Sequence, residues 1–592
     1  MTRDGRGVFG ASVAAINLDR NLIYTALTES DGSYSFAGPG TGRYAVYAEP
    51  LNGPAKPDQL LGSGSSDGYY TDLDDVQIFG TGIAVDRSRP ARVLTDKSGS
   101  EVGIGFLVRV ASDAAPGPRA VAIKVGDEQA AGTGGVVVTP RSIPAAILYF
   151  PYLLATQDHY TGIALVNPSL TPAAVRVVAR DGQGVLLYDR DAVIPADLAI
   201  APAAQTARLE RQIFNLPADS KQAGSVIVES DNREVQGFFL AGDLSSNYLD
   251  GADAFTRGRR ELCFTDILQN AETTTEIHLM NIKDIAASIQ LALIGGSGAI
   301  LKGPLVQTIP PFGKIGKSVA ELFGIKTDLN AAHVTALASD ETIVGFSYIR
   351  QRDAAFGLNA QSPEGASEVL YSPQLAVGKF GVTYRTRLNI VNAGGSPAAV
   401  TVELLGDNGL PLSGTSRYTP PAIAAGGQLA VDTETYFGLA GKGSLQGSIR
   451  VSAPSGSKLM GNVVFGDGDP TKGRLDFGAA LPLYSSGSAD FIFSQVAEGS
   501  GFYTGLAFMA PEGATVQVAA CTQDGKLVGS GSLILAPTAR SVSLLQALIP
   551  ATRGQVGGYL RVTSTKPVIG FELFGATNGR FLSAVPPQRQ LY

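Results

Sequence analysis

The stretch TGIALVN at residues 161–167 recurs in register along this chain and decides the fold that we expect. It returns as TEIHLMN at 275–281 and as TRLNIVN at 386–392, whereas TGLAFMA at 504–510 keeps the frame and ends in Ala. In each copy alternating apolar residues follow the Thr, which is the period-2 pattern of a half-buried β-strand. The repeated polar positions are Thr161, Asn167, Thr275, Asn281, Thr386, Asn392 and Thr504.

A second signature closes each copy. It reads GSVIVESDNREVQGFFLAG from Gly224 and HVTALASDETIVGFSYI from His333, and related segments begin at Gly447 and Gly558. The glycines shared by the four signatures are Gly237, Gly345, Gly461 and Gly570, which lie 108, 116 and 109 residues apart. Because solenoid repeats run only about 20 to 50 residues, a period this long indicates a whole domain. The sequence therefore predicts an array of four similar modules.

Each module is expected to hold roughly seven short strands, the number typical of a two-sheet sandwich. Asp181-Gly182 and Asp524-Gly525 are hairpin signals, and a short helical stretch precedes each closing signature. We therefore predict an all-β protein, a tandem array of immunoglobulin-like or transthyretin-like β-sandwich domains. In such an array, modest interfaces between modules would give a semi-rigid rod.

The segment before the repeats carries two resemblances. Gly10-Ala11-x-Val13, TESDGSYSFA at 28–37 and Gly42-x-Tyr44-x-Val46 resemble the carboxypeptidase regulatory-like domain. That resemblance implies a transthyretin-like sandwich that is an accessory module without catalytic residues. FLVRVASDAAPGPRAVAIKVGDEQAAGTGGVVVTP at 106–140 is similar to bacterial immunoglobulin-like modules. The four long modules resemble uncharacterised tandem β-sandwich repeats of large secreted bacterial proteins, a resemblance that implies no activity.

These patterns predict six domains. They are the regulatory-like sandwich, N-terminally incomplete, at 1–79, a small immunoglobulin-like domain at 80–144, and sandwich repeats at 145–258, 259–366, 367–485 and 486–592.

The charge and hydropathy of the chain argue against nucleic-acid binding and against a transmembrane helix. The net charge of −7 leaves no basic footprint for nucleic acid. No apolar run reaches the roughly 18 to 20 residues that a transmembrane helix needs. The opening MTRDGRGVFGASV lacks a secretory signal. Because the first domain should have a strand before Gly7, we expect that Met1 is not the native N-terminus and that the protein is secreted or held at the cell surface.

The sequence offers no catalytic constellation, so we expect a non-enzymatic protein without a cofactor. His159, His278 and His333 fall at different module positions without ligands at metal spacing, which favours surface or edge histidines. Cys263 and Cys521 are interpreted as buried apolar residues. A GxSxG match at 64–68 lacks the strand, turn and helix of a nucleophile elbow.

Acidic clusters beside glycines are weak candidates for calcium, which prefers oxygen ligands. The candidates are Asp72, Asp74 and Asp75, Asp467 and Asp469, and a further pair, Asp250 and Asp253. Solvated polar turns are the alternative interpretation. The repeated Asn is interpreted as a turn cap, with ligand binding as its alternative.

Together these features favour a non-enzymatic extracellular structural or adhesive protein with itself or a cell-surface or matrix molecule as partner. Unpaired strand edges could join such subunits into a filament or surface layer. The alternative is a carbohydrate-binding, substrate-anchoring fragment of a secreted hydrolase. Tyr47, Tyr69 and Tyr70 could form a sugar platform in that case, although the chain has no Trp.

Overall fold

The computed structural model divides the chain into two compact units, Met1–Ile143 and Pro144–Tyr592. It describes residues 144–588 apart from 188–195, 218–219, 246, 352–353, 413–416 and 469–474, and before residue 144 it describes the strands named below with a few neighbouring residues. Antiparallel strands make up nearly all of the regular structure, which confirms the predicted all-β fold class.

The first unit consists of short antiparallel strands. They are β1 (Thr2–Arg3), β2 (Arg6–Gly7), β3 (Ser12–Asn17), β4 (Leu22–Leu27), β5 (Tyr44–Glu49), β6 (Asp75–Phe79), β7 (Ile83–Val85), β8 (Arg92–Thr95), β9 (Glu101–Gly105), β10 (Val108–Val110), β11 (Gly117–Val125) and β12 (Glu128–Val138). Strand β3 pairs with β4 and β5, and β11 pairs with β12 and β6. Because β6 precedes the predicted boundary at residue 79, a sheet crosses that boundary.

Each module of the second unit is a sandwich of eight strands, one more than the sequence indicated. The first module comprises β13 (Ala146–Ala155), β14 (His159–Asn167), β15 (Ala173–Arg180), β16 (Ala196–Ile200), β17 (Ala204–Leu209), α2 (Glu210–Phe214), β18 (Gln222–Ser230), β19 (Gln236–Asp243) and β20 (Leu249–Asp253). Its outer sheet has the order β13-β18-β15-β16, and its inner sheet has the order β17-β14-β19-β20.

The second module repeats this order. Its elements are β21 (Glu261–Phe264), β22 (Thr273–Asn281), β23 (Ala287–Gly295), β24 (Ile300–Ile309), β25 (Lys314–Ser318), α3 (Val319–Phe323), β26 (Ala332–Ala338), β27 (Ile343–Gln351) and β28 (Ala354–Asn359), followed by the 3-10 turn η1 (Pro363–Gly365).

The third and fourth modules keep the plan with local variations. The third contains β29 (Val369–Phe380), β30 (Val382–Asn392), β31 (Thr401–Leu405), β32 (Arg417–Tyr418), β33 (Gln428–Asp432), α4 (Thr433–Tyr436), β34 (Leu445–Ser452), β35 (Leu459–Asp467) and β36 (Phe477–Pro482). The fourth contains β37 (Ser488–Phe493), β38 (Phe502–Met509), β39 (Ala514–Cys521), β40 (Leu527–Leu535), β41 (Arg540–Leu544), α5 (Leu545–Leu548), the 3-10 turn η2 (Pro550–Thr552), β42 (Tyr559–Ala576) and β43 (Leu582–Val585). Strand β42 serves as both the sixth and the seventh strand, because it pairs in both sheets.

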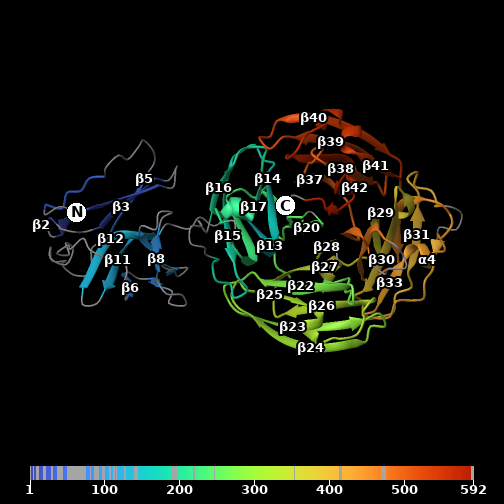
Figure 1. Cartoon of the computed structure of the whole chain (residues 1–592), viewed down its shortest axis with the longest axis horizontal. Helices are drawn as coiled ribbons and strands as arrows, with labels where there is room; N and C mark the ends of the chain where they lie inside the picture. Colours follow the sequence, from blue (N-terminus) through green and yellow to red (C-terminus); the bar gives the residue numbers. More distant parts are fainter. Residues whose placement is uncertain are drawn as a thin grey trace. The chain divides into compact units, whose positions relative to one another are not determined.

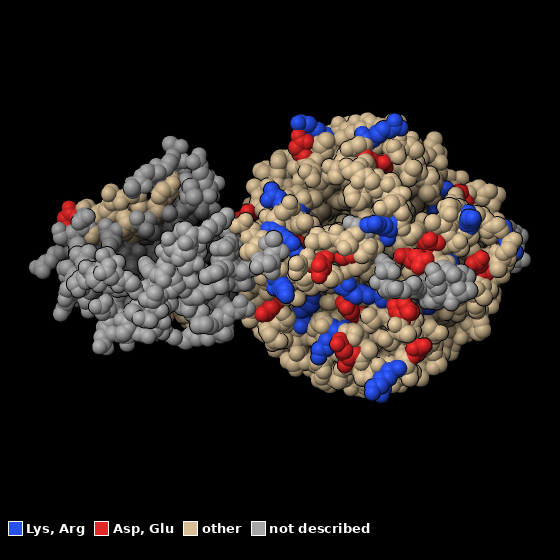
Figure 2. All heavy atoms as spheres, viewed as in Figure 1, with Lys and Arg blue, Asp and Glu red and all other residues tan. Residues whose placement is uncertain are grey.

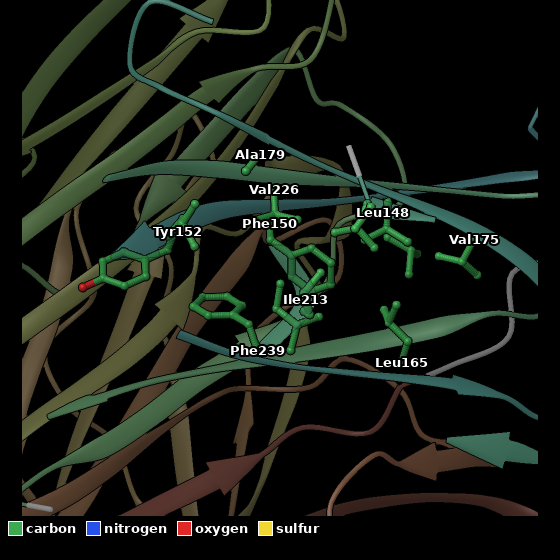
Figure 3. Packing of buried hydrophobic residues seen from close by; sticks show 14 of the residues in the cluster. Leu148, Phe150, Tyr152, Leu165, Val175, Ala179, Ile213, Val226 and Phe239 are labelled. Carbon is green, nitrogen blue, oxygen red and sulfur yellow. The ribbon is translucent and has the colours of Figure 1, made fainter. Parts of the chain in front are cut away.

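The core of each module lies between its two sheets. In the first module the rings of Phe150, from the outer sheet, and Phe239, from the inner sheet, meet edge to face with centroids 6.0 Å apart (Figure 3). Val175 and Val226 of the outer sheet and Leu165 of the inner sheet complete the contact, and all five side chains are fully buried. Alternate residues of the strands thus form the core, as the period-2 pattern predicts.

The repeated Thr links the two sheets of its module. The Thr161 hydroxyl accepts a hydrogen bond from Leu154 N at 2.9 Å and donates one to Leu154 O at 3.0 Å. The same two-way bond joins Thr275 to Leu268, Thr386 to Ala376 and Thr504 to Ala497. One buried hydroxyl therefore satisfies both backbone groups of a residue that lies on the first strand of the module or shortly after it.

The repeated Asn closes two turns at once. The Asn281 amide nitrogen Nδ2 donates to the carbonyls of Ile285 at 2.6 Å and Pro310 at 3.0 Å, and its Oδ1 accepts from Lys283 N at 3.0 Å. Asn167 and Asn392 make the same set of bonds. All three side chains are buried, so their amides cap the chain rather than face solvent.

The shared glycine makes room for an aromatic ring. A Cβ at Gly345 would lie 2.7 Å from Cζ of Phe264, and one at Gly237 would lie 2.8 Å from Cζ of Phe150. Both phenylalanines come from the first strand of the module. Glycine is therefore required here by close packing across the sandwich.

The four modules form a closed ring (Figure 1), whereas the sequence had suggested a rod. Their last strands contact one another in a complete cycle, β20 to β28, β28 to β36, β36 to β43 and β43 back to β20. The inner sheets are buried on both faces. Phe346 of the second module joins the first module's core, and Phe238 of the first joins the fourth's. Because neighbouring modules complete the cores of the first, third and fourth modules, a straight array would expose phenylalanine side chains such as Phe238.

We predict that Asn281→Ala lowers the free energy of unfolding by about 2–4 kcal/mol, because buried carbonyls lose their donors. Urea denaturation of the full chain provides the measurement. Asn578→Ala is the control, since Asn578 is exposed and only bonds the nearby Arg580 N. Equal stability of the two variants would contradict the capping role.

Candidate functional site

The centre of the ring is built from small residues on the four last strands. A Cβ at Gly251 of β20 would lie 1.7 Å from Phe239 O, and one at Gly357 of β28 would lie 2.5 Å from Cζ of Phe346. Ala480 of β36 and Ala584 of β43 are buried at the same centre. Small side chains let four strands from four modules meet.

A buried carboxyl, Asp250, joins three of these modules. It belongs to the first module, accepts from Gly357 N of the second at 2.9 Å, and accepts from the Ser583 hydroxyl of the fourth at 2.7 Å. The residue is fully buried. Burial disfavours the charged form and raises the pKa of Asp250 to about 7, against the opposing effect of these hydrogen bonds.

A cavity of about 390 Å³ lies against the same strands. Its wall contains residues from all four modules, among them Ala252, Leu358, Ala480 and Ala584. A small-molecule site typically measures about 300 to 1,000 Å³ and combines apolar walls with a few polar groups. This space, the axial cavity, exists only because the ring is closed.

Charged and polar side chains line one part of the axial cavity. Arg257 and Arg259 both belong to the wall, and their proximity together with burial lowers the pKa of Arg259. Arg259 forms an ion pair with Glu364 at 3.0 Å. Asn359 donates through Nδ2 to both the carbonyl and the carboxylate of Asp253, and its buried Oδ1 accepts no bond from any residue that the structure describes.

One position of the repeat connects neighbouring modules at every junction. It lies on the fifth strand of each module, where it pairs with the residue directly before the repeated Asn, or before Ala510 in the fourth module. The position is occupied by Gln205, Lys314, Gln428 and Arg540. Lys314 Nζ donates to the carbonyls of Pro151 and Gly224 in the first module at 2.7 and 2.8 Å. The position thus places a hydrogen-bond donor inside the preceding module.

The other junctions follow the same rule. Gln205 donates to Ser494 O and Gly558 O of the fourth module at 2.6 and 2.8 Å, which closes the ring. Gln428 donates to Thr265 O of the second module at 2.9 Å. Arg540 instead uses side chains of the third module, pairing with Asp407 at 3.0 Å and donating to Gln374 at 2.9 Å.

The junction between the first and second modules carries a concentration of charge beside a cavity of about 630 Å³. Glu276 lies 3.1 Å from Arg350 and 3.4 Å from His278. Burial lowers the pKa of Lys314 to about 7 and that of His278 to about 4, so His278 is neutral at physiological pH. Lys314 already bonds two carbonyls and contacts His278 Nδ1 at 3.2 Å, so these groups hold the joint together.

The predicted calcium residues are not brought together as a described site. Asp72, Asp74 and Asp469 lie outside the described residues, Asp75 begins β6, and Asp467 Oδ1 accepts from Thr383 N at 2.9 Å. Among the described residues, no three His, Cys, Asp or Glu side chains are arranged to hold a metal. The GxSxG match, Tyr69 and Tyr70 also fall outside the described residues, as does the side chain of Tyr47.

Two histidines lie deeper than expected. His278 and His333 are buried at module junctions rather than at the surface, and His333 Nδ1 meets Gln428 Oε1 at 3.3 Å. His159 bonds the Thr156 hydroxyl at 3.0 Å. Both cysteines are free thiols, Cys263 being buried and Cys521 half-buried. The histidine prediction was wrong for two residues because it assumed that modules do not cover one another.

The sequence contains a signal for the four junction residues that its repeats alone do not make obvious. Each lies five residues before the short helix of its module begins, at Glu210, Val319, Thr433 and Leu545. A polar residue that recurs at one repeat position, where an edge strand starts, indicates a shared contact. The residue type changes among Gln, Lys and Arg, which conceals the common donor function.

The surface carries mixed charge. On the face drawn in Figure 2, Lys and Arg are interspersed with Asp and Glu over the second unit. Within the described part of the chain, no helix is long and apolar enough to cross a membrane.

No family model matches the chain, and no curated protein matches it.

We predict that Asp250→Asn abolishes a pH dependence of stability. Because the folded-state pKa of about 7 exceeds the usual value near 3.9, the folded protein holds this proton more tightly. The resulting stabilisation is complete below about pH 4 and is lost as the pH rises through 7, by roughly 4 kcal/mol at most. Urea unfolding at pH 4.5, 6 and 8 measures it, and parallel curves for the variant and the natural protein would refute this assignment.

Gln205→Ala should loosen the joint that closes the ring. The Gly558 amide, which donates to Gln205 Oε1 at 2.9 Å, would lose its acceptor. We expect peptides containing Gly558 and Ser494 to exchange amide hydrogen at least tenfold faster by mass spectrometry. Gln517→Ala, which removes an exposed glutamine, should leave both peptides unchanged. Unchanged exchange in Gln205→Ala would mean that packing alone closes the ring.

Proposed function

We propose that the chain is a non-enzymatic extracellular structural or adhesive protein that self-associates through an exposed strand edge. The observation that carries the proposal is strand β40. It is the outermost strand of its sheet and pairs on one side only, with β39. Its other side presents backbone donors and acceptors that a strand from another molecule can pair with.

The composition of β40 suits such pairing. The strand reads LVGSGSLIL and contains neither Pro nor a charged residue. Leu527 is 65% exposed and Ile534 is 85% exposed. Native edge strands are commonly protected by Lys, Pro, bulges or short length. The register of β40 shifts once, between Leu527 and Gly529 at its start, and the rest of the strand has none of these protections.

The equivalent strands of the other modules are better protected. Strand β24, the other long edge, contains Lys302 and the Gly303-Pro304 bond, and its pairing with β23 shifts register there. Strand β16 has five residues and β32 has two. Among these four equivalent edges, β40 is therefore the one that is open over most of its length.

A single open edge favours a pair of rings over a filament. Two copies of β40 can run antiparallel about a two-fold axis, which joins two sheets into one and uses the same surface on both partners. A filament or surface layer would need a second open edge, and Pro304 interrupts β24. We therefore propose paired rings as the first step of assembly at a cell surface or in a matrix.

The second candidate is a carbohydrate-binding accessory module. It is favoured by the axial cavity, in which polar side chains and small apolar residues line one enclosed wall. The resemblance of the first unit to carboxypeptidase regulatory-like domains supports both candidates equally, because such domains are accessory modules of secreted proteins.

Ile534→Lys should abolish pairing of the rings. Lysine removes an apolar contact and introduces charge repulsion between the two edge strands. We expect the natural full chain to sediment as a dimer at 50 µM in analytical ultracentrifugation and the variant to sediment as a monomer with an unchanged melting temperature.

Ile300→Lys is the matched control, since Ile300 is 59% exposed on the protected strand β24. It should remain dimeric. A natural chain that is monomeric at this concentration, or a control that dissociates equally, would overturn the proposed edge pairing. Negative-stain images of the natural protein should show rings in pairs.

A further inference from the structure

We propose that the axial cavity is a binding site for an acidic sugar, such as a hexuronate. The inference deepens the carbohydrate-binding candidate and does not depend on pairing of the rings. Three features of the cavity wall define the ligand: a guanidinium pair, a buried oxygen without a donor, and an apolar surface of small residues.

The guanidinium pair selects a negative group. Arg257 is exposed and makes no ion pair with any described residue, while Arg259 is held by Glu364. Burial lowers the pKa of Arg259, and repulsion from the nearby Arg257 lowers it further. A carboxylate bound to Arg257 would relieve this repulsion and would match the fork of the guanidinium with two parallel hydrogen bonds.

The buried oxygen selects a hydroxyl. Asn359 Nδ2 contacts two acceptors, the carbonyl and the carboxylate of Asp253, at 2.9 and 2.8 Å. These contacts fix the orientation of the amide, so Oδ1 must be the atom without a donor. Leaving a buried acceptor unpaired costs about 1–3 kcal/mol, so a small shift of the Asn359 side chain toward a ligand hydroxyl in the cavity would be favourable.

The remaining wall suits a sugar ring. Ala252, Ala480, Leu481 and Ala584 present small aliphatic groups, and Thr256 adds a hydroxyl to the polar part. A wall with a polar part and an apolar part corresponds to a pyranose, which carries equatorial hydroxyls around two apolar faces. A volume of about 390 Å³ is at the small end of ligand sites, which suits a monosaccharide or the end of a chain.

A peptide C-terminus also offers a carboxylate and an N–H donor, but it offers few further polar groups. The cavity wall includes Asp253, Thr256, Asn359, Gln361 and Ser362 in addition to the arginines. This number of polar side chains favours a ligand with several hydroxyls. The site requires the closed ring, because its wall is contributed by all four modules.

Calorimetric titration of the full chain with D-glucuronate, D-galacturonate and D-glucose tests the inference. We expect at least one uronate to bind at least tenfold more tightly than glucose. Arg257→Ala should weaken uronate binding at least tenfold. Arg260→Ala is the matched control, since Arg260 is exposed nearby and lies outside the cavity wall, and it should bind as the natural chain does.

The outcomes separate the site from the function. Equal binding of uronates and glucose, with no effect of Arg257→Ala, would overturn the site and leave carbohydrate binding standing elsewhere on the chain. Binding of N-acetyl-alanyl-alanine in place of any sugar would overturn the ligand class. If no sugar binds to a chain whose sedimentation and melting are normal, both the site and the carbohydrate-binding function fail, while ring pairing is unaffected.

Discussion

The ring depends on one requirement, a donor for a backbone carbonyl that the first strand leaves unpaired in three of the four modules. In the first module the register of β13 shifts between Phe150 and Leu153, which takes Pro151 O out of the ladder. In the second and fourth modules the first strand ends one residue before the corresponding carbonyl. A buried carbonyl without a donor is costly, and in these three modules the donor comes from the following module. Each of these three modules by itself leaves one carbonyl without a donor. Supplying that donor joins the module to the one that follows it in the ring.

Much of a single module could be predicted from the sequence, because its determinants are local and repeated. The Thr and Asn of the strand 161–167 occupy equivalent positions in the structure and make equivalent hydrogen bonds in the next two modules. The eighth strand was missed because LDGAD at 249–253 is short and shows no alternation. Its pattern reflects contacts with strands of two other modules, β28 and β43, which no single repeat can reveal.

The closed ring and the axial cavity could not be predicted for the same reason. The run GFFLAG at 237–242 is apolar throughout, which is the signature of a strand buried on both faces. This pattern was available, but it does not say which surface covers the second face. The sequence offers Asp250 only as a weak calcium candidate or as part of a solvated polar turn, and only the meeting of β20, β28 and β43 makes it a buried carboxyl. Long-range geometry, rather than residue type, assigns these roles.

Closure of the ring also limits how this architecture can evolve. In an open array, recombination between repeats can add or delete a module and leave the others intact, since the two terminal modules do not contact each other. Here the first module must meet the fourth through Gln205 and Gly558. A ring of three or five modules would need a different turning angle at every joint. Closure with these joints therefore requires four modules, while the individual sequences remain free to diverge.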